Sequence, residues 1–346
     1  MSVAVLVASL WSTDSVNHMT DITFFQAERQ DVSITFVTPQ PARAVFAGRN
    51  LPGVLVAEPF RTVPATLSHR NHSRRVAVTG RPRTPHLSRV LSPDLRPMAM
   101  PEAGLILSEA LAEALDLRPG ESVTAEFLEG GQPKVTLPVS GISIGYVGLG
   151  AAMDLTELNR IMGNGQVVSG LNLMVDEARK DAFFTAVKTA PGADFVTVKA
   201  VTVKRFKETL AENITVMISV YAVLAMVLAV GVVYNFARIA LSEQGRELAS
   251  LRVLGFTRRE VSGILLGELA FVVVLAQPLG WSIGYGIGLA MVSAFSSDLY
   301  RVPFVIGRDV YATASLAVIG AALASAWLIR GRINALDMVR VLKTRE

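Results

Sequence analysis

The chain of 346 residues contains no cysteine and few charged side chains. The absence of cysteine excludes a disulfide framework, a zinc ribbon and a thiol nucleophile. Charged residues make up only 18% of the sequence, whereas soluble domains contain about 25%. A soluble protein of this length would have too few charges to cover its surface. Together with the mean hydropathy of +0.43, the composition indicates an integral membrane protein.

The shortage of charge is concentrated near the C-terminal end. Three stretches carry no charged residue at all: 213–237, 269–297 and 310–329. A helix of about 20 apolar residues is long enough to span a bilayer core of roughly 30 Å. The predicted transmembrane helices are residues 209–241, 257–296 and 310–331. We expect a kink in the second helix at Pro278, since proline breaks the backbone hydrogen bonding of a helix.

Basic residues are distributed unevenly around these helices. Five arginines lie between the first and second helices or at the ends of those helices that face each other. Five basic residues lie at the C-terminal end, whereas the loop 297–309 contains two. Because lysine and arginine are retained on the cytoplasmic side, we expect the segment 242–256 and the tail 332–346 in the cytoplasm. Residues 20–208 and the loop 297–309 are then extracytoplasmic. The same rule accounts for the net charge of +4, so no nucleic-acid partner is predicted.

The first eleven residues, Met1–Trp11, form a short apolar run. At 1.5 Å per residue they reach about 17 Å, which is half a bilayer. No lysine or arginine precedes Arg29, which argues against a signal peptide. We interpret residues 1–19 as the outer half of a transmembrane helix that continues as an exposed stalk, with more apolar sequence upstream in the native protein. The alternative is a short segment that lies in the membrane interface.

Residues 20–208 alternate between short β-rich runs and short helices, which is typical of an α+β domain. The runs Thr62–Ser68 and Arg75–Thr79 flank a polar tip and predict a hairpin. Ser108 and Asp154 stand before two predicted helices, where their side-chain oxygens can cap the first turn.

Residues 101–148 predict a β-rich lobe within this domain. The runs 123–128 and 135–144 are expected to pair across a Gly130–Gly131 turn. We interpret this lobe as an insertion between two halves of one sheet-and-helix unit.

The sequence contains no motif of an enzyme. It has no phosphate-binding G-x-x-x-x-G-K-[ST] loop, no G-x-S-x-G elbow and no H-E-x-x-H. His69 and His72 lie at the predicted hairpin tip without a nearby carboxylate or thiol, which favours solvated histidines over a metal site. We therefore predict no catalytic residue, no cofactor site and no metal site in this chain.

Two features of the second predicted transmembrane helix point to packing. Gly280, Gly284 and Gly288 recur every four residues, and such spacing favours close helix contact within or between chains. The alternative is that transmembrane helices are simply rich in glycine. Glu268 lies two turns into the helix, where an unpaired carboxylate would be costly. We expect it to pair near the cytoplasmic interface; a proton relay is the other interpretation.

The cytoplasmic segment 242–256 predicts a short, charged, amphipathic helix. Glu243 lies in its first turn, where the helix dipole favours an acid. Gly255 has the position of a C-terminal cap. Thr257 and Glu260 form a capping box for the helix that follows. The apolar face can rest on the membrane helices, and the charged face can meet water or a partner.

These residues carry a family resemblance. The pattern Glu243-x-x-Arg246-Glu247-x-Ala249-x-Leu251-Arg252-x-Leu254-Gly255-Phe256 resembles the FtsX-like permease family of ABC transporters, of the MacB and LolC/LolE type. The tail 336–343 is similar to the closing motif of that family. Residues 51–54 and 111–123 resemble its periplasmic core domain more loosely. The cytoplasmic segment is most similar to longer permeases with two membrane repeats, so the chain is expected to be the second half of such a protein.

The resemblance implies an α-helical transmembrane bundle with an α+β, MacB-like periplasmic core in a bacterial inner membrane. A separate cytoplasmic P-loop ATPase would bind ATP and dock on the coupling residues, Glu243, Arg246, Glu247, Leu251, Arg252 and Gly255. Such permeases work as homodimers or with a second permease half. They move lipids, lipoproteins, peptides or drugs by mechanotransmission. The alternative within the family is a signalling scaffold that activates a cell-wall hydrolase.

Overall fold

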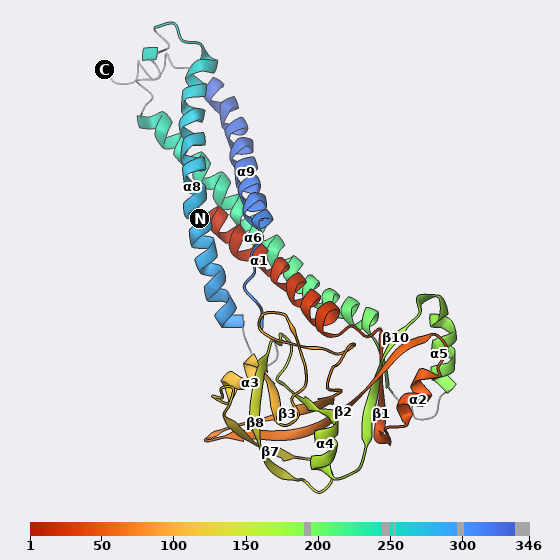
Figure 1. Ribbon diagram of the computed structural model, residues 1–346. Helices are drawn as coiled ribbons and strands as arrows, with labels where there is room; N and C mark the ends of the chain where they lie inside the picture. The colour runs from red at the N-terminus through yellow and green to blue at the C-terminus, as the bar shows by residue number, and fades with distance from the viewer. Residues whose placement is uncertain (190–194, 244–249, 252–253, 296–300, 336–346) are drawn as a thin grey trace. The chain divides into compact units, whose positions relative to one another are not determined.

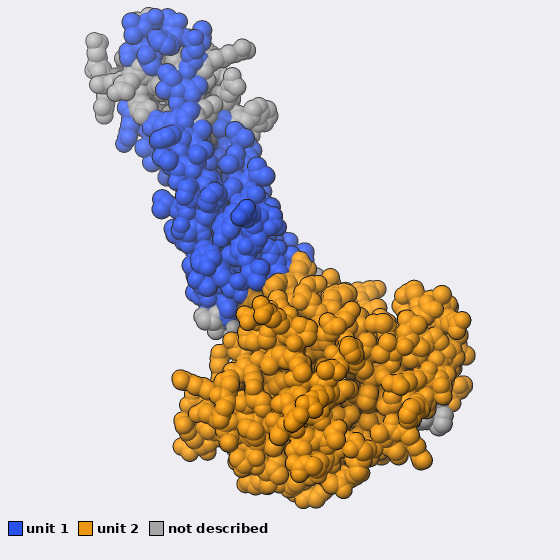
Figure 2. Space-filling model, viewed as in Figure 1, with its two compact units in different colours: residues 1–16, 210–294, 304–346 blue, residues 17–209, 295–303 orange. Residues whose placement is uncertain are grey.

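The computed structural model describes residues 1–189, 195–243, 250–251, 254–295 and 301–335. The chain divides into two compact units, which Figure 2 shows in different colours. The membrane unit comprises residues 1–16, 210–294 and 304–346, and the sheet unit comprises residues 17–209 and 295–303.

Long helices make up the described part of the membrane unit (Figure 1). They are α1 (Ser2–Asp21), α6 (Lys199–Glu243), α8 (Arg258–Phe295) and α9 (Arg308–Ala335). Among the described residues, three segments are long and apolar enough to cross a membrane: Thr215–Phe236, Gly267–Val292 and Arg308–Ala326. They overlap the three stretches expected from the sequence, so a helix of sufficient length and hydrophobicity is present at each. The first of these helices, α6, begins ten residues before its predicted start at residue 209. Pro278 lies inside α8; the kink there stays a prediction.

The N-terminal helix differs from its prediction. It runs without a break from Ser2 to Asp21, and its apolar residues Val3 and Val7 are buried against α6 and α9. The stretch after Trp11 is not an exposed stalk, because Ser12 and Ser15 are both buried. These hydroxyl groups satisfy their hydrogen bonds inside the protein: Ser12 donates to the backbone of its own helix, and Ser15 donates to the carbonyl of Val305. Small polar residues can be buried in this way because their hydroxyl groups form hydrogen bonds within the protein.

The sheet unit contains eleven described strands. They are β1 (Val32–Pro41), β2 (Val54–His69), β3 (His72–Arg81), β4 (Val90–Leu91), β5 (Pro97–Met98), β6 (Leu105–Ser108), β7 (Ser122–Phe127), β8 (Lys134–Ser143), β9 (Gly150–Asp154), β10 (Val167–Val175) and β11 (Phe195–Val198). Its short helices are η1 (Ile22–Ala27), α2 (Ala44–Arg49), α3 (Glu109–Ala114), α4 (Leu155–Met162), η2 (Glu177–Arg179) and α5 (Lys180–Thr189).

Strand β2 belongs to two groups of strands. Nine strands form one sheet in the order β11-β1-β10-β2-β3-β9-β6-β8-β7, and β7 also pairs with β2. The sheet therefore closes on itself into a ring of six strands that begins and ends at β2. Residues 54–60 of β2 pair with β10, and residues 61–69 pair with β3. One long strand thus joins an open three-stranded extension to the ring.

Each part has its own hydrophobic core. In the ring, alternate residues of β2 such as Val63 and Leu67 point inward and pack with Phe127 of β7. The open part packs Leu173 of β10 against Phe183 of α5. In Figure 1, α2 and α5 lie beside β1 and β10, away from the ring.

Local features of the sheet unit agree with the sequence. The hairpin expected around residues 69–73 is β2–β3, with Arg70 at a positive φ of 51° in its turn. The pairing of β7 with β8 is also confirmed. Ser108 accepts from the backbone N–H of Leu111, and Asp154 accepts from the first turn of α4. The predicted N-caps are therefore confirmed.

The predicted limits of the β-rich lobe, 101–148, are too narrow. That segment contributes β6, β7 and β8, but the ring also needs β9, β3 and the second half of β2. The segment 101–148 does not form a lobe by itself, because Ala65–Ser68 of β2 pair directly with Thr124–Phe127. The ring strands, residues 61–154, do lie in sequence between strands of the open part, as an insertion would. Pairing between strands so distant in the sequence leaves no local pattern from which it could be read.

A buried arginine lies where β2 changes partners. Arg61 is 0% exposed, and it donates to Asn159 Oδ1 at 2.5 Å and to Glu129 Oε1 at 3.4 Å. Asn159 in turn donates to the carbonyl of Val167, the first residue of β10. Burying a guanidinium costs free energy unless it is paired and hydrogen-bonded. Both terminal nitrogens of Arg61 have such a partner, whereas its Nε has none in the described structure. The three side chains therefore tie β2 to α4 and to the β7–β8 turn.

We expect Asn159→Ala to lower the free energy of unfolding of the sheet unit by about 1–3 kcal/mol, the cost of leaving a buried donor unsatisfied. Urea-dependent proteolysis of the detergent-solubilised chain measures this loss. The matched control is Arg160→Ala on the same helix, which removes an exposed ion pair with Glu157 and should change stability by about 0.5 kcal/mol or less. Equal losses in both variants would contradict the role given to Arg61.

Candidate functional site

The predicted coupling segment is described in part. Arg246, Glu247 and Arg252 lie outside the described residues. Glu243 is the last residue of α6 and Leu251 is half-buried.

The turn that ends this segment is well defined. Phe256 N–H donates to the carbonyl of Leu251 at 3.1 Å, and Gly255 between them has a φ of +98°. This combination is a Schellman motif, in which a residue with a left-handed backbone closes the helix. Glycine adopts that conformation without a steric penalty. The C-cap position predicted for Gly255 is confirmed.

The next helix starts directly after this turn. Glu260 Oε2 accepts from the backbone N–H of Thr257 at 2.7 Å and from its hydroxyl at 2.8 Å. In return the Thr257 hydroxyl accepts from the N–H of Glu260 at 3.3 Å. This is the expected capping box. The hydrogen bond from the Thr257 backbone, followed by the one from its side chain, lowers the pKa of the Glu260 carboxyl, so it stays ionised at neutral pH.

Two apolar side chains beside this turn face solvent. Leu254 is 76% exposed and Phe256 is 43% exposed. They flank Gly255, whose conformation fixes the direction in which they point. Neither was among the predicted coupling residues, although both stand in the pattern that carries the family resemblance. Their exposure follows from the fold of the turn and could not be read from hydrophobicity alone.

The three glycines of α8 lie against other parts of the membrane unit. A Cβ atom at Gly280 would meet Val3 at 2.7 Å, and one at Gly284 would meet Val7 at 2.8 Å. At Gly288 it would meet the ring of Phe304 at 2.7 Å. All three distances are shorter than real Cβ contacts allow. The glycines therefore permit α1 to lie directly on α8, and this contact is made within one chain.

The loop that precedes α9 is held on the far end of α1. Val305 N–H donates to Ser15 Oγ at 3.2 Å, and Gly307 N–H donates to Asp14 Oδ2 at 2.9 Å. The ring of Phe304 packs on Trp11 at 5.6 Å and on Tyr285 at 5.0 Å. Because Tyr285 belongs to α8, this cluster joins α1, α8 and the start of α9.

Within the sheet unit, one arginine from the segment between α8 and α9 lies on α3. Arg301 forms ion pairs with Glu109 and Glu113, and its N–H donates to the carbonyl of Tyr146. The hydrogen bond that Arg301 donates to Glu113, with the charges of Glu113 and Glu109, raises the pKa of Arg301. Sequence reasoning used Arg301 only to count charges. Its contacts are more than a hundred residues distant in sequence, so no motif marks them.

Two other predicted positions can be placed. Glu268 is the second residue of the candidate span Gly267–Val292, and it has an interaction partner. The identity of that partner stays a prediction. His69 and His72 end β2 and begin β3. Among the described residues, no group of three or more histidine, aspartate or glutamate side chains could hold a metal ion.

Comparison with known proteins identifies the C-terminal third of the chain. Residues 219–337 match the family model of the FtsX-like permease C-terminal domain. No curated protein matches the chain. The extracellular domain of the noncanonic ABC-type transporter YknZ from Gram-positive bacteria is similar at 14% identity, with a TM-score of 0.32, over 49% of this chain and 98% of that chain. The periplasmic region of MacB from Actinobacillus actinomycetemcomitans is similar at 12% identity, with a TM-score of 0.37, over 54% of this chain and 95% of that chain.

The contact between α1 and α8 predicts unequal effects of two glycine substitutions. Gly284→Val should destabilise the membrane unit by about 1–3 kcal/mol, as overpacking does, because the new side chain meets Val7. Gly286→Val is the matched control on the same helix, since a Cβ there meets no atom within 4 Å. The thermal unfolding midpoint of each variant in detergent measures the difference. A loss of stability in both, or in neither, would contradict the contact.

Proposed function

We propose, from the membership of residues 219–337 in the FtsX-like permease family, that the chain is the permease subunit of an ABC transporter. The sequence has no phosphate-binding loop of its own, so ATP is bound and hydrolysed by a separate cytoplasmic P-loop ATPase. The permease works in a bacterial inner membrane, as a homodimer or with a second permease half. Its sheet unit is extracytoplasmic.

The observation that carries this proposal is the turn between two membrane-spanning helices. It is rigid, because the Schellman bond of Phe256 closes one side and the capping box of Thr257 and Glu260 closes the other. It also exposes Leu254 and Phe256. A connection that is closed by hydrogen bonds and exposes apolar side chains can bind a partner and transmit the displacement of that partner to the membrane helices. Exposed apolar groups beside charged ones are typical of protein interfaces.

Movement at this turn would be passed along α8. Along α8, α1 lies on the glycine face. Beyond α8, Arg301 fastens the following segment to α3 of the sheet unit. The three spans contain almost no internal charge, which favours mechanical work on a lipid, lipoprotein, peptide or drug over passage through an aqueous pore.

The proposed topology can be tested with single cysteines, because the chain has none of its own. We expect Asn71→Cys in the exposed β2–β3 turn to react with a membrane-impermeant maleimide in intact spheroplasts. Ser250→Cys should react only after the membrane is permeabilised. The basic residues near Ser250 fix this orientation. Reaction of both positions from the outside would overturn the assignment.

The proposed coupling can be tested by Leu251→Asp and Glu247→Arg. Both variants should reach the membrane at normal levels but fail to co-purify with the ATPase and fail to stimulate its hydrolysis of ATP. Truncating a desolvated charged pair in an interface costs about 2–5 kcal/mol, which lowers affinity by a factor of about 30 or more.

The matched control is Glu126→Arg on β7, which reverses an exposed charge in the sheet unit and should leave co-purification and hydrolysis unchanged. If both segment variants behave like this control, residues 243–256 are a solvated helix and the coupling assignment is wrong.

A further inference from the structure

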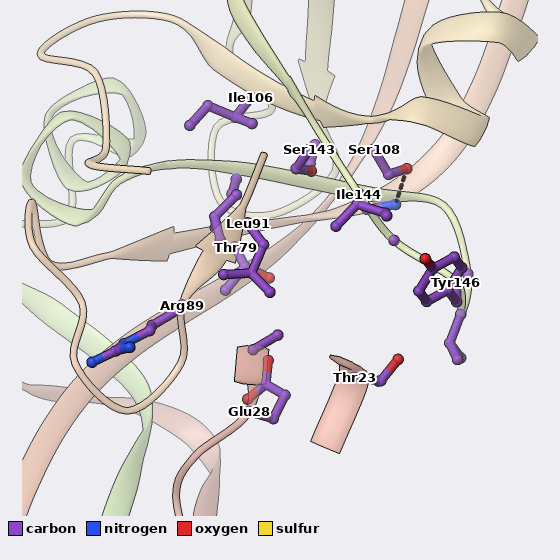
Figure 3. A pocket seen from close by; sticks show the side chains of 18 of the residues that line it. Thr23, Glu28, Thr79, Arg89, Leu91, Ile106, Ser108, Ser143, Ile144 and Tyr146 are labelled. Carbon is purple, nitrogen blue, oxygen red and sulfur yellow. Dashed lines mark hydrogen bonds between the residues drawn. The ribbon is translucent and has the colours of Figure 1, made fainter. Parts of the chain in front are cut away.

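A cavity of about 280 Å³ lies in the sheet unit, on the outer surface of the strand ring (Figure 3). Every residue that lines it belongs to that unit. A cavity of about 150 Å³ in a protein interior already holds benzene, and ligand pockets begin at about 300 Å³. The space is therefore large enough for a small organic molecule.

Small residues on two adjacent strands, β3 and β9, help to create this cavity. Residues of β3, β9 and β6 alternate between the ring core and the outer surface, and Ala77, Gly150 and Ala152 face outward. Gly150 shows how open the space is, since a Cβ atom added there would meet nothing within 4 Å. The backbone of Gly150 is nevertheless fixed, because its N–H donates to Ser108 Oγ at 3.1 Å, the dashed bond in Figure 3. The cavity is thus a built feature of the sheet.

The lining is apolar along the middle and charged at one end. In Figure 3, Leu91 and Ile144 lie between Arg89 on one side and Tyr146 on the other. Ile106 adds to the apolar wall and is almost fully buried. Such a lining suits a molecule with an apolar body and one polar end.

The charge at that end is not balanced. The carboxylate of Glu28 accepts from Ser88 Oγ at 3.0 Å and from Gln30 Nε2 at 2.5 Å, and it forms an ion pair with Arg81 at 3.4 Å. Glu28 and Arg81 thus neutralise one another. Arg89 lines the same cavity, and within the described part of the chain its guanidinium has no hydrogen bond or ion pair. The positive charge of Arg89 is therefore not neutralised by a described carboxylate, and it lies beside the apolar part of the lining.

We propose that this cavity binds a small amphipathic anion, with its anionic head on the guanidinium of Arg89 and its apolar body along Leu91, Ile106 and Ile144. A guanidinium pairs well with a carboxylate or a phosphate, since its donors form a planar fork. This site is separate from the cytoplasmic turn, and it does not rest on the permease assignment.

The test measures binding of decanoate to the full chain in lipid nanodiscs by equilibrium dialysis, with empty nanodiscs subtracted. We expect saturable binding of one decanoate per chain. Decanol, which lacks the charge, should bind about tenfold more weakly, and so should inorganic sulfate, which lacks the apolar body.

Two variants locate the ligand. Arg89→Gln should weaken decanoate binding about tenfold and leave decanol binding unchanged, because only the anionic head meets that residue. Gly150→Leu should abolish binding of both, because the new side chain occupies the open space. The matched controls are Arg75→Gln, an exposed arginine on β3, and Gly131→Leu in the β7–β8 turn, where a Cβ also meets no atom. Both controls should bind decanoate like the unaltered chain.

Several results would overturn the proposal. Absence of saturable binding would do so, as would decanoate binding that survives Gly150→Leu in a variant that unfolds at the normal temperature. Equal affinity for decanol and decanoate would remove the role of Arg89, and sulfate binding as tight as decanoate would reduce the site to a simple anion site. ATPase stimulation is not measured in this test, so failure here leaves the coupling proposal standing, and failure of coupling leaves this one standing.

Discussion

The organisation of the membrane unit depends on the absence of side chains at three positions of α8. Gly280, Gly284 and Gly288 let α1 and Phe304 approach the backbone of α8 closely. In a bilayer, apolar side chains gain little by leaving lipid for protein, so helix association relies on close van der Waals contact. Once α1 is seated there, Asp14 and Ser15 at its far end can hold the backbone that leads into α9. One glycine face therefore organises three helices.

Small residues have a second consequence in the sheet unit. Ala77, Gly150 and Ala152 leave space on the outer surface of the ring, where larger residues would have filled it. In α8 the missing side chains are replaced by a neighbouring helix, whereas on the sheet nothing described replaces them. The same residue types thus produce close packing in one unit and a cavity in the other. Small residues give close packing where another element of the chain lies against them, and they leave a cavity where no described element does.

The features that sequence predicted are those fixed by local chemistry. The three spans follow from uncharged runs, and the β2–β3 hairpin follows from a polar tip between apolar strands. The caps at Ser108, Asp154 and Gly255 need only the residues beside them. Sequence did not predict the pairing of β2 with β7, the contacts of Arg301 or the cavity at Gly150. Each of these features joins segments that are far apart in the chain, and tertiary packing rather than local sequence brings those segments together.

The turn at Gly255 and the cavity differ in the physical interactions on which they depend. The turn offers apolar side chains, Leu254 and Phe256, held outward by a backbone that glycine makes possible. Its partner must bring a surface of its own, since nothing described encloses these residues. The cavity instead encloses its ligand and supplies an unpaired guanidinium, so a small molecule is sufficient. A charge reversal on the surface disturbs the first kind of site and a filled space disturbs the second. The two activities can therefore be separated by substitution within a single chain.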